Sequence, residues 1–182
     1  FRRVLFRSVT FLNKNGHFLG RLCGPVSGNV LLRKRQYDKT QDSEFSSCFV
    51  RDLLYGKIKN SKTVLLRHAR KATGIEKDAL LHGAESLSHL AKQLSECSDI
   101  NSMRGVEGAA ATAYFAQFDY MLSSPAGFRF VVRSRRPPLS EVNALLSFLY
   151  TMRAHDTASA LETVGLDPAA GYLHTLRPGR AS

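Results

Sequence analysis

The chain has 182 residues, of which 43% are hydrophobic, so it is long enough and apolar enough to bury the core of a domain. It has no apolar run of about 18 residues or more, which argues against a membrane span, and its N-terminal residues are too often interrupted by Arg and Ser for a signal peptide. We therefore expect a cytoplasmic protein, and the three cysteines, which form no C-x-x-C pair, argue against a disulfide framework or a structural zinc site.

Basic residues exceed acidic ones by 26 to 15, which gives a net charge of +11. Such an excess is typical of proteins that bind a polyanion, whether DNA, RNA or an anionic membrane surface. The basic residues gather in three patches: Arg33 to Arg35; Lys57, Lys59, Lys62, Arg67, Arg70 and Lys71; and Arg129, Arg133, Arg135 and Arg136. One patch alone is usually a solvated face, but three patches in a small chain without Trp favour nucleic acid over a membrane.

The first element predicted from the sequence is a β-hairpin between Val9 and Leu32. Short apolar runs alternate there with the turn signals Asn15-Gly16 and Gly24-Pro25. After it the pattern is helical, and we place helices at residues 29–37, 43–56, 60–72, 76–96, 102–123 and 141–164. The sequence therefore predicts a mainly α fold, in which helices follow a small β-element.

Two features delimit the last predicted helix. Ser140 follows Pro137 and Pro138 and is a suitable N-cap, and Gly165 is a suitable stop because glycine readily adopts the left-handed conformation after a helix. The Arg-rich segment 124–138, between the last two helices, should form a loop or a short extended arm.

The predicted helix over 102–123 carries one carboxylate, Glu107, between two glycines. At about 100° per residue, Glu107 lies in the middle of an apolar stripe made of Ala110, Ala111, Tyr114, Phe118, Met121 and Leu122. Burying a carboxylate is costly unless the charge is neutralised, paired or bound to metal, so Glu107 requires a partner. On the helix alone, an ion pair with a nearby Arg such as Arg104 is the commoner explanation, and a metal site is the alternative.

Three motifs occur in order along the second half of the chain: RGVEGAAATAYF, RSRRPPLSEVNALLSFLY and ALETVGLDPAAGYLHTLRPGRAS. Together they resemble the catalytic half of the CRISPR-associated integrase that inserts new spacers, the first of the two CRISPR adaptation proteins, and the subtype I-C-like branch fits best. Upstream, VTFLNKNGHFLGRLCGPVSGNVLLRKRQY and GKIKNSKTVLLR resemble the end of that family's N-terminal β-domain and its connecting helices. The resemblance runs from Val9 to Ser182, and the agreement of three motifs in their order makes it specific.

The resemblance implies a metal site. In the family, the Glu of the R-G-x-E-G motif and the His of the G-[FY]-[LV]-H motif bind a divalent metal together with an acid on the following helix. By motif match these are Glu107 and His174, and the third acidic ligand is expected beyond Ser182. Oxygen ligands with one imidazole suit Mg²⁺ or Mn²⁺ better than zinc. The implied enzyme is a metal-dependent DNA endonuclease and integrase, in which a DNA 3′ hydroxyl attacks a phosphodiester of the CRISPR repeat.

The resemblance also implies roles for residues around this site. Arg104 would neutralise or orient Glu107, and the third basic patch would hold the backbone phosphates of double-stranded DNA through Arg129, Arg133, Arg135 and Arg136. Asn143 lies in the first turn of its helix, where it either helps the cap or supports the active site. Tyr150 is expected to be a core aromatic residue whose hydroxyl lies near the site.

The chain departs from the family pattern at both ends. It stops at Ser182, before the helix that bears the third ligand, and the first strands of the β-domain are missing, so we interpret it as truncated at both ends and weakly active or inactive alone. Residues 1–8 do not fit the pattern and are interpreted as foreign or truncation-derived sequence. The predicted domains are a remnant of the N-terminal β-domain over 1–32 and an incomplete α-helical catalytic domain over 33–182.

The partners implied by the resemblance are double-stranded DNA, a second copy of the chain in a homodimer, and the small second CRISPR adaptation protein, and no membrane is expected. The family's biological role is antiviral defence through spacer acquisition. A different class of protein explains the same residues: a basic helical nucleic-acid-binding module without catalysis, in which Glu107 pairs with Arg104. The two hypotheses differ in whether Glu107 and His174 converge on one metal ion.

Overall fold

A computed structural model describes residues 8–14, 18–23, 29–122 and 127–174 of the chain. The chain forms two compact units, which we call unit 1 (residues 1–43 and 145–182) and unit 2 (residues 44–144). The predicted boundary between a β-domain remnant and a helical domain at residue 32 stays a prediction. The same holds for the interpretation of the first eight residues as foreign or truncation-derived sequence, because all but one of them lie outside the described ranges.

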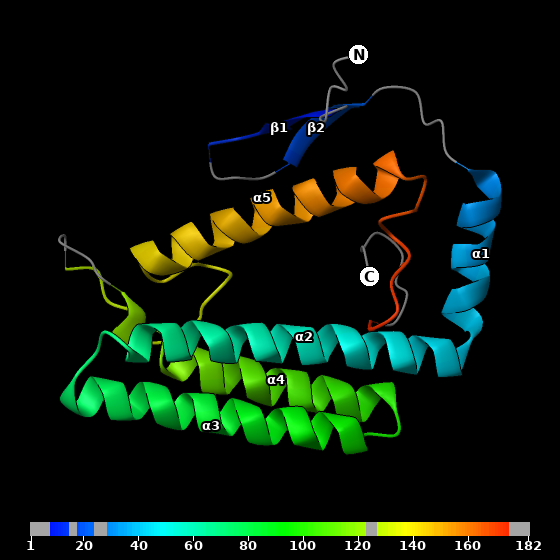
Figure 1. Ribbon diagram of the computed structural model, residues 1–182. Coiled ribbons are helices and arrows are strands. Elements are labelled where there is room, and N and C mark those ends of the chain that lie inside the picture. Colours follow the sequence, from blue (N-terminus) through cyan, green and yellow to red (C-terminus); the bar gives the residue numbers. More distant parts are fainter. Residues whose placement is uncertain (1–7, 15–17, 24–28, 123–126, 175–182) are drawn as a thin grey trace, which may run out of the picture. The chain divides into compact units, whose positions relative to one another are not determined.

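Unit 1 contains an antiparallel hairpin of β1 (Ser8–Leu12) and β2 (Phe18–Cys23), labelled in Figure 1. The predicted hairpin is therefore confirmed. The turn signals Asn15-Gly16 and Gly24-Pro25 lie outside the described residues.

The remaining elements of the described chain are helical, which confirms the predicted mainly α fold (Figure 1). They are α1 (Val30–Gln41), α2 (Ser43–Ala69), α3 (Gly74–Glu96), α4 (Ile100–Ala116), the short 3-10 helix η1 (Asp119–Met121) and α5 (Glu141–Thr163). None of the helices in the described part of the chain has a stretch long and apolar enough to cross a membrane.

Helix α2 is continuous, although the sequence predicted two helices at 43–56 and 60–72. Its buried apolar residues recur four or seven positions apart, at Val50, Leu54, Ile58, Leu65 and Ala69. A single apolar stripe therefore runs the length of the helix and includes Ile58, which lies in the predicted break. Burial of this stripe overrides the weaker local signals that suggested an interruption.

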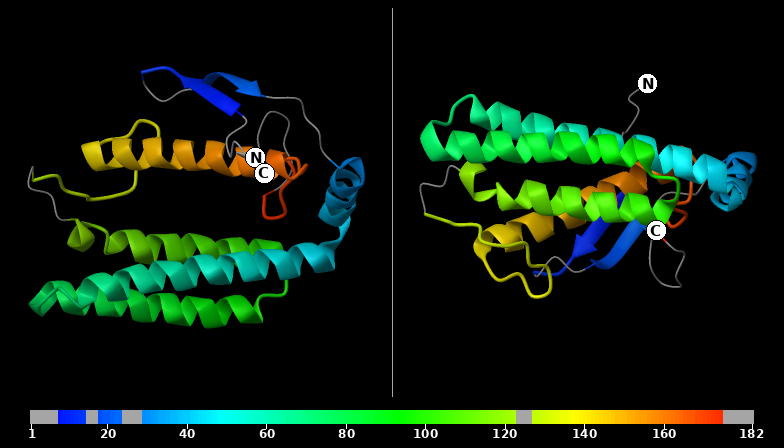
Figure 2. Two further views of the ribbon diagram at one scale, coloured as in Figure 1. Left: turned by 45° about the horizontal axis from the view of Figure 1, so that its top comes forward. Right: turned by 90° about the horizontal axis from the view of Figure 1, so that it is seen from below.

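The core of unit 2 lies between α2, α3 and α4, which run side by side in Figures 1 and 2. Its most deeply buried side chains are Leu65, Leu80, Leu87, Leu94 and Met103. Gly83 of α3 is part of the close packing, because a Cβ atom there would lie 2.6 Å from the Gln117 side chain and 3.2 Å from Leu65 Cδ1. This packed unit carries Glu107 and the Arg-rich loop.

Both predicted limits of α5 are confirmed. The Ser140 hydroxyl accepts a hydrogen bond from the backbone N–H of Asn143 at 3.3 Å, as an N-cap does. At the other end Gly165 has a φ of 90°, and the N–H groups of Gly165 and Leu166 donate to carbonyls of the last turn, each at 3.0 Å. This is the arrangement in which glycine stops a helix.

Candidate functional site

Glu107 is carried by α4, whose start is fixed by the N-cap Asp99. The Asp99 carboxylate accepts hydrogen bonds from the backbone of Asn101 at 2.8 Å and of Ser102 at 3.0 Å, and from the Ser102 hydroxyl at 2.5 Å. These bonds, led by that of the Ser102 hydroxyl, hold the pKa of Asp99 below its ordinary value. The helix ends at Ala116, earlier than the predicted residue 123, because the next N–H groups bond three residues back, at 3.2 and 3.1 Å.

Glu107 lies at the edge of the buried face of α4, which corrects the prediction that it lies in the middle. The buried residues of α4 are Met103, Val106 and Ala110, whose mean direction is roughly 65° from that of Glu107 at about 100° per residue. The Glu107 side chain keeps 28% of its surface exposed. Helical periodicity gives the relative directions of side chains, but the positions of neighbouring helices decide which direction is buried.

The Glu107 carboxylate forms an ion pair with Lys57 of α2, which lies 50 positions earlier in the sequence. The Lys57 side chain is itself 54% exposed, so the pair lies at the surface of unit 2. Sequence reasoning placed Lys57 in a basic patch but did not connect it with Glu107; the predicted pairing with Arg104 stays a prediction. Glu107 is thus an accessible oxygen donor that already has one cationic partner.

His174 is exposed and lies at the end of the described segment that follows α5. This segment is held to α1 by Gln36, a buried residue with 8% of its surface exposed. Gln36 Nε2 donates to the carbonyl of Asp167 at 2.9 Å, and the N–H of Asp167 donates to Gln36 Oε1 at 2.8 Å. Gln36 Nε2 also donates to the carbonyl of Ala170 at 3.4 Å, so three hydrogen bonds join one side-chain amide to the backbone of the segment that leads to His174.

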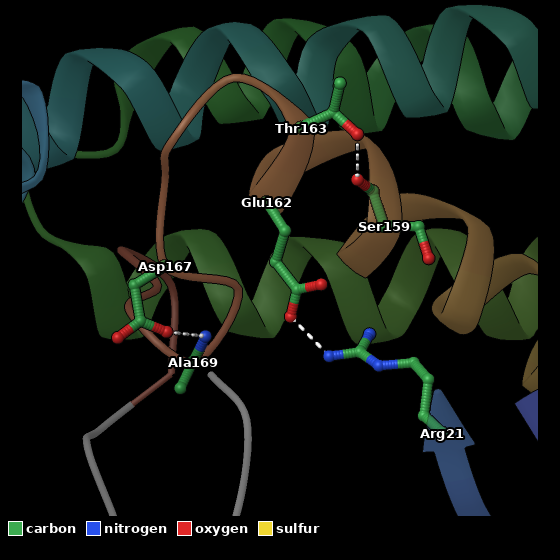
Figure 3. Close-up of polar contacts among 6 residues, drawn as sticks. All are labelled: Arg21, Ser159, Glu162, Thr163, Asp167 and Ala169. Atoms are coloured by element: carbon green, nitrogen blue, oxygen red, sulfur yellow. Dashed lines mark hydrogen bonds and ion pairs between the residues drawn. The ribbon is translucent and has the colours of Figure 1, made fainter. Parts of the chain in front are cut away.

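The Asp167 carboxylate strengthens the same attachment. It accepts hydrogen bonds from the Tyr37 hydroxyl and, at 2.8 Å, from the backbone N–H of Ala169, the contact drawn in Figure 3. The bond from Tyr37, followed by that from Ala169, holds the pKa of Asp167 below its ordinary value, and the same contact raises the pKa of Tyr37. Asp167 therefore acts as an ionised anchor of the segment.

Side-chain contacts join the hairpin of unit 1 to α5. Arg21 of β2 donates to Glu162 Oε1 at 2.5 Å, as Figure 3 shows. The Phe18 ring stacks on His155 with the ring centroids 5.6 Å apart. These contacts fix β2 against the helix that precedes the His174 segment.

The Arg-rich segment forms a loop, as predicted, over its described residues 127–138, and its first part is fixed by Asp119 of η1. Asp119 accepts a hydrogen bond from the backbone N–H of Phe130 at 2.7 Å and pairs with Arg129 Nε at 3.3 Å. The buried Phe130 ring lies against Phe115 and Phe118, with centroids 5.7 and 4.8 Å apart. This end of the loop is therefore anchored in an aromatic cluster.

The last part of the loop is fixed by Asn143, which has only 2% of its surface exposed. Its Oδ1 accepts hydrogen bonds from Ser134 N and Arg133 Nη1, both at 3.0 Å. Its Nδ2 donates to the carbonyl of Val132 at 2.8 Å and to the Ser140 hydroxyl at 3.1 Å. The predicted contribution of Asn143 to the cap is confirmed by the contact with Ser140, and its support of an active site stays a prediction.

The four arginines predicted to bind phosphate differ in exposure. The Arg129 side chain is 80% exposed, and Arg135 and Arg136 are also exposed. Arg133 is half-buried, and its Nη1 donates to the carbonyl of Ser134 at 2.5 Å in addition to Asn143. Arg133 therefore contributes to the framework of the loop, whereas the other three extend into solvent.

Tyr150 is 54% exposed, which corrects the prediction that it is a core aromatic residue. In the described chain α5 buries only Val142 and Asn143. The apolar composition of α5 suggested that its aromatic residues are buried, but composition does not show what covers a helix. The proximity of the Tyr150 hydroxyl to a catalytic site stays a prediction.

The predicted metal site depends on how many ligating side chains the described residues bring together. Among the described residues, no group of three or more His, Cys, Asp or Glu side chains is arranged to hold a metal ion. A half-exposed carboxylate and an exposed imidazole are suitable donors for Mg²⁺ or Mn²⁺, but two ligands do not make a complete protein site. Glu107 belongs to unit 2 and His174 to unit 1, and their convergence stays a prediction.

A model of the protein family described as "CRISPR associated protein Cas1" matches residues 6–182. The chain belongs to the Cas1 family. A relative from Chlorobaculum tepidum, named CRISPR-associated endonuclease Cas1 1, is 46% identical over 96% of this chain and 52% of its own length. A relative of the same name from Moorella thermoacetica is 44% identical over 96% of this chain and 51% of its own length. The chain thus spans about half the length of the curated Cas1 relatives that it matches.

Solved structures of Cas1 proteins and of a casposase share the fold. A CAS1 protein from Thermotoga maritima has a TM-score of 0.79 at 26% identity, over 96% of this chain and 52% of that one. A chain of a partial Cas6-RT-Cas1–Cas2 complex has a TM-score of 0.74 at 27% identity, over 96% and 51%. A casposase bound to its integration product has a TM-score of 0.76 at 25% identity, over 95% and 47%. The family resemblance is therefore confirmed, and the subtype stays a prediction.

Proposed function

We propose that this chain is part of a Cas1 enzyme that acts as a DNA endonuclease and integrase and inserts new spacers into a CRISPR array. The match to the Cas1 family over residues 6–182 carries the proposal. Two relatives are named CRISPR-associated endonuclease Cas1 1, and a protein of similar fold is a casposase bound to its integration product. In the proposed reaction a DNA 3′ hydroxyl attacks a phosphodiester of the repeat, so that one P–O bond forms and another breaks.

Glu107 and His174 would hold Mg²⁺ or Mn²⁺, together with a third acidic ligand from outside the present sequence. The bound ion would polarise the phosphodiester and stabilise charge on the attacking and leaving oxygens. Lys57 already pairs with Glu107, so it must move aside or share the carboxylate when a cation binds there. Arg104 would orient Glu107 from the same helix.

Double-stranded DNA would contact the Arg-rich loop. Arg129, Arg135 and Arg136 are exposed, and arginine binds backbone phosphate through two parallel N–H groups. The half-buried Arg133 would act mainly through the loop itself. Such contacts give affinity without sequence preference, as expected of a protein that holds DNA of many sequences.

The proposed enzyme would work as a homodimer with a Cas2-type partner. A solved structure with similar fold is a chain of a partial Cas6-RT-Cas1–Cas2 complex. Because the proposed substrate is the cell's own CRISPR array, we place the enzyme in the cytoplasm.

A basic helical module that binds DNA without catalysis is the second candidate. It is favoured by the ion pair of Glu107 with Lys57, because that pair accounts for the carboxylate without a metal. In this case neither Glu107 nor His174 would affect any metal-dependent reaction.

The test compares the present chain with a version extended to the length of the curated relatives. We expect Mn²⁺-dependent strand transfer into a repeat-containing plasmid from the extended protein, and little or none from the 182-residue chain. In the extended protein Glu107→Gln and His174→Ala should each lower the rate about 100-fold or more. Glu85→Gln, which changes an exposed carboxylate of α3, is the matched control and should have no effect.

Two results would count against this proposal. Unchanged strand transfer in the Glu107 and His174 variants would overturn the assignment of the ligands. DNA binding by the extended protein without any metal-dependent joining would favour the binding module.

A further inference from the structure

We infer that Asn143 is a positioning residue that holds the Arg-rich loop in one conformation, so that Arg135 and Arg136 are presented to DNA phosphates before DNA binds. The inference rests on the proposed DNA binding. It adds to that proposal the residue that positions the loop, and it distinguishes the arginines that bind phosphate from the one that supports the loop.

The Asn143 side chain uses its full hydrogen-bonding capacity. A carboxamide offers two acceptor positions on oxygen and two donor hydrogens on nitrogen. Asn143 uses all four, and three of its partners are in the loop: Val132, Arg133 and Ser134. An Asp would direct an acceptor at the carbonyl of Val132, and a Leu of similar shape would make none of the four bonds. The position therefore requires Asn if the loop is to keep this conformation.

A further hydrogen bond, between Leu139 and Ser134, closes the end of the loop. The Ser134 hydroxyl accepts a hydrogen bond from the backbone N–H of Leu139 at 2.8 Å. The four residues between them are Arg135, Arg136, Pro137 and Pro138, all of them exposed. The two prolines restrict the backbone of this short turn further. The turn therefore projects from a base that is closed by Ser134 and held to α5 by Asn143.

The arginines of this turn have different tasks. Arg133 points its Nη1 at Asn143 Oδ1 and at the carbonyl of Ser134, at 3.0 and 2.5 Å. It forms part of the base. Arg135 and Arg136 follow after Ser134 and are exposed, so these two arginines would contact phosphate.

A prepared loop binds more tightly than a flexible one because less conformational freedom is lost on binding. Removing the hydrogen bonds that Asn143 and Ser134 make should therefore weaken DNA binding, while the same arginines still reach the phosphates. The slope of log K against log salt counts phosphate contacts, so it should stay the same. Removing an arginine, in contrast, should reduce this slope by about one contact.

The experiment uses the 182-residue chain and DNA duplexes of unrelated sequence at several salt concentrations. Two variants should make the loop more flexible, Asn143→Ala and the milder Ser134→Ala. Ser134→Ala loses only the hydrogen bond from Leu139. It keeps the inference testable if Asn143→Ala does not fold. Asn101→Ala is the matched control, since Asn101 is also in the first turn of a helix of unit 2 but is exposed. Trypsin cleavage after Arg133 and Arg135 reports on loop mobility without DNA.

We expect Asn143→Ala to lower affinity about tenfold and Ser134→Ala about threefold, both with an unchanged salt slope and faster cleavage in the loop. Asn101→Ala should behave as the parent chain. The inference is overturned if folded Asn143→Ala and Ser134→Ala keep the parent affinity, or if affinity and slope fall together while cleavage stays unchanged.

Two further variants separate this inference from the proposed function. If Arg135→Gln and Arg136→Gln leave affinity and slope unchanged, the proposed DNA surface itself fails. If they reduce both while Asn143→Ala has no effect, DNA binds the loop and only the positioning role of Asn143 is wrong.

Discussion

Two segments without regular secondary structure carry most of the predicted functional residues, and one buried side-chain amide holds each of them. The loop over 127–138 is held by Asn143, whose partners in the loop lie 9 to 11 positions away in the sequence. The segment that leads to His174 is held by Gln36, whose partner Asp167 lies 131 positions away. The same chemistry thus makes one segment self-contained and the other dependent on a distant part of the chain.

This difference determines how each segment responds to a loss of stability. The Asn143 contacts join residues of one short stretch, so little chain entropy opposes them. The Gln36 contacts close a very long loop of the chain and form only when α1 and the end of α5 are both folded. We therefore expect the His174 segment to open at a lower free energy than the Arg-rich loop.

The largest effect on stability is expected for Asn143→Ala. It removes a buried side chain together with its four hydrogen bonds, so we expect the free energy of unfolding to fall by about 3 kcal/mol. Urea denaturation measures this loss. Asn101→Ala should cost no more than about 0.5 kcal/mol, because its side chain is exposed. Equal losses in the two variants would remove the distinction between a buried anchor and a surface amide.

A smaller effect is expected for Gln36→Leu, which leaves the N–H and carbonyl of Asp167 without their partner. We expect a loss of about 1 to 2 kcal/mol, because water can reach this segment more easily than it reaches Asn143. Hydrogen exchange should accelerate at the amides of Asp167 and Ala169 and stay unchanged in α3.

Gln41→Leu is the matched control for this change, since Gln41 is on the same helix but is exposed. Unchanged exchange at Asp167 in Gln36→Leu would show that other contacts hold the segment, and the contrast with Asn143 would then disappear.

The smallest expected effect is a dependence on pH of the contacts that hold the His174 segment. The folded-state pKa of Asp167 is depressed, so its contribution to stability is present above the unfolded value of about 3.9 and is lost as the pH falls through the folded value. The four hydrogen bonds of the Asn143 side chain, to Val132, Arg133, Ser134 and Ser140, involve no carboxylate, so these bonds themselves should not respond.

Tyr37→Phe removes the leading cause of this shift and should raise the pKa of Asp167 towards its ordinary value. A titration of the Asp167 carboxyl carbon by NMR measures the change. An identical midpoint in the parent and the variant would show that Tyr37 is not the group that stabilises the ionised carboxylate.

Local patterns allowed the elements of the fold to be predicted. The hairpin, the helical region and both limits of α5 depend on residues within a few positions of each other, such as Ser140 and Gly165. The predicted break in α2 was wrong because the burial of Ile58 depends on packing against other helices. The predicted end of α4 was wrong because the chain turns tightly after Ala116.

The site was predictable in its motif residues but not in their surroundings. Glu107 was identified as a carboxylate that needs a partner, yet its partner Lys57 is 50 positions away and no periodicity connects the two. Gln36 has no signal at all in the sequence, because its role exists only after α1 meets the segment beyond α5. Asn143 could be singled out, since its position in the first turn of a helix is a local feature.

The Arg-rich loop separates the residues that fold it from those that face solvent. Asp119, Phe130 and Asn143 fix its two ends, whereas Arg135 and Arg136 are exposed. Substitutions at the exposed positions can therefore change charge, size or hydrogen bonding without disturbing the loop. Mutation could adapt this surface to a new binding partner one side chain at a time, as antibody loops vary on a constant framework.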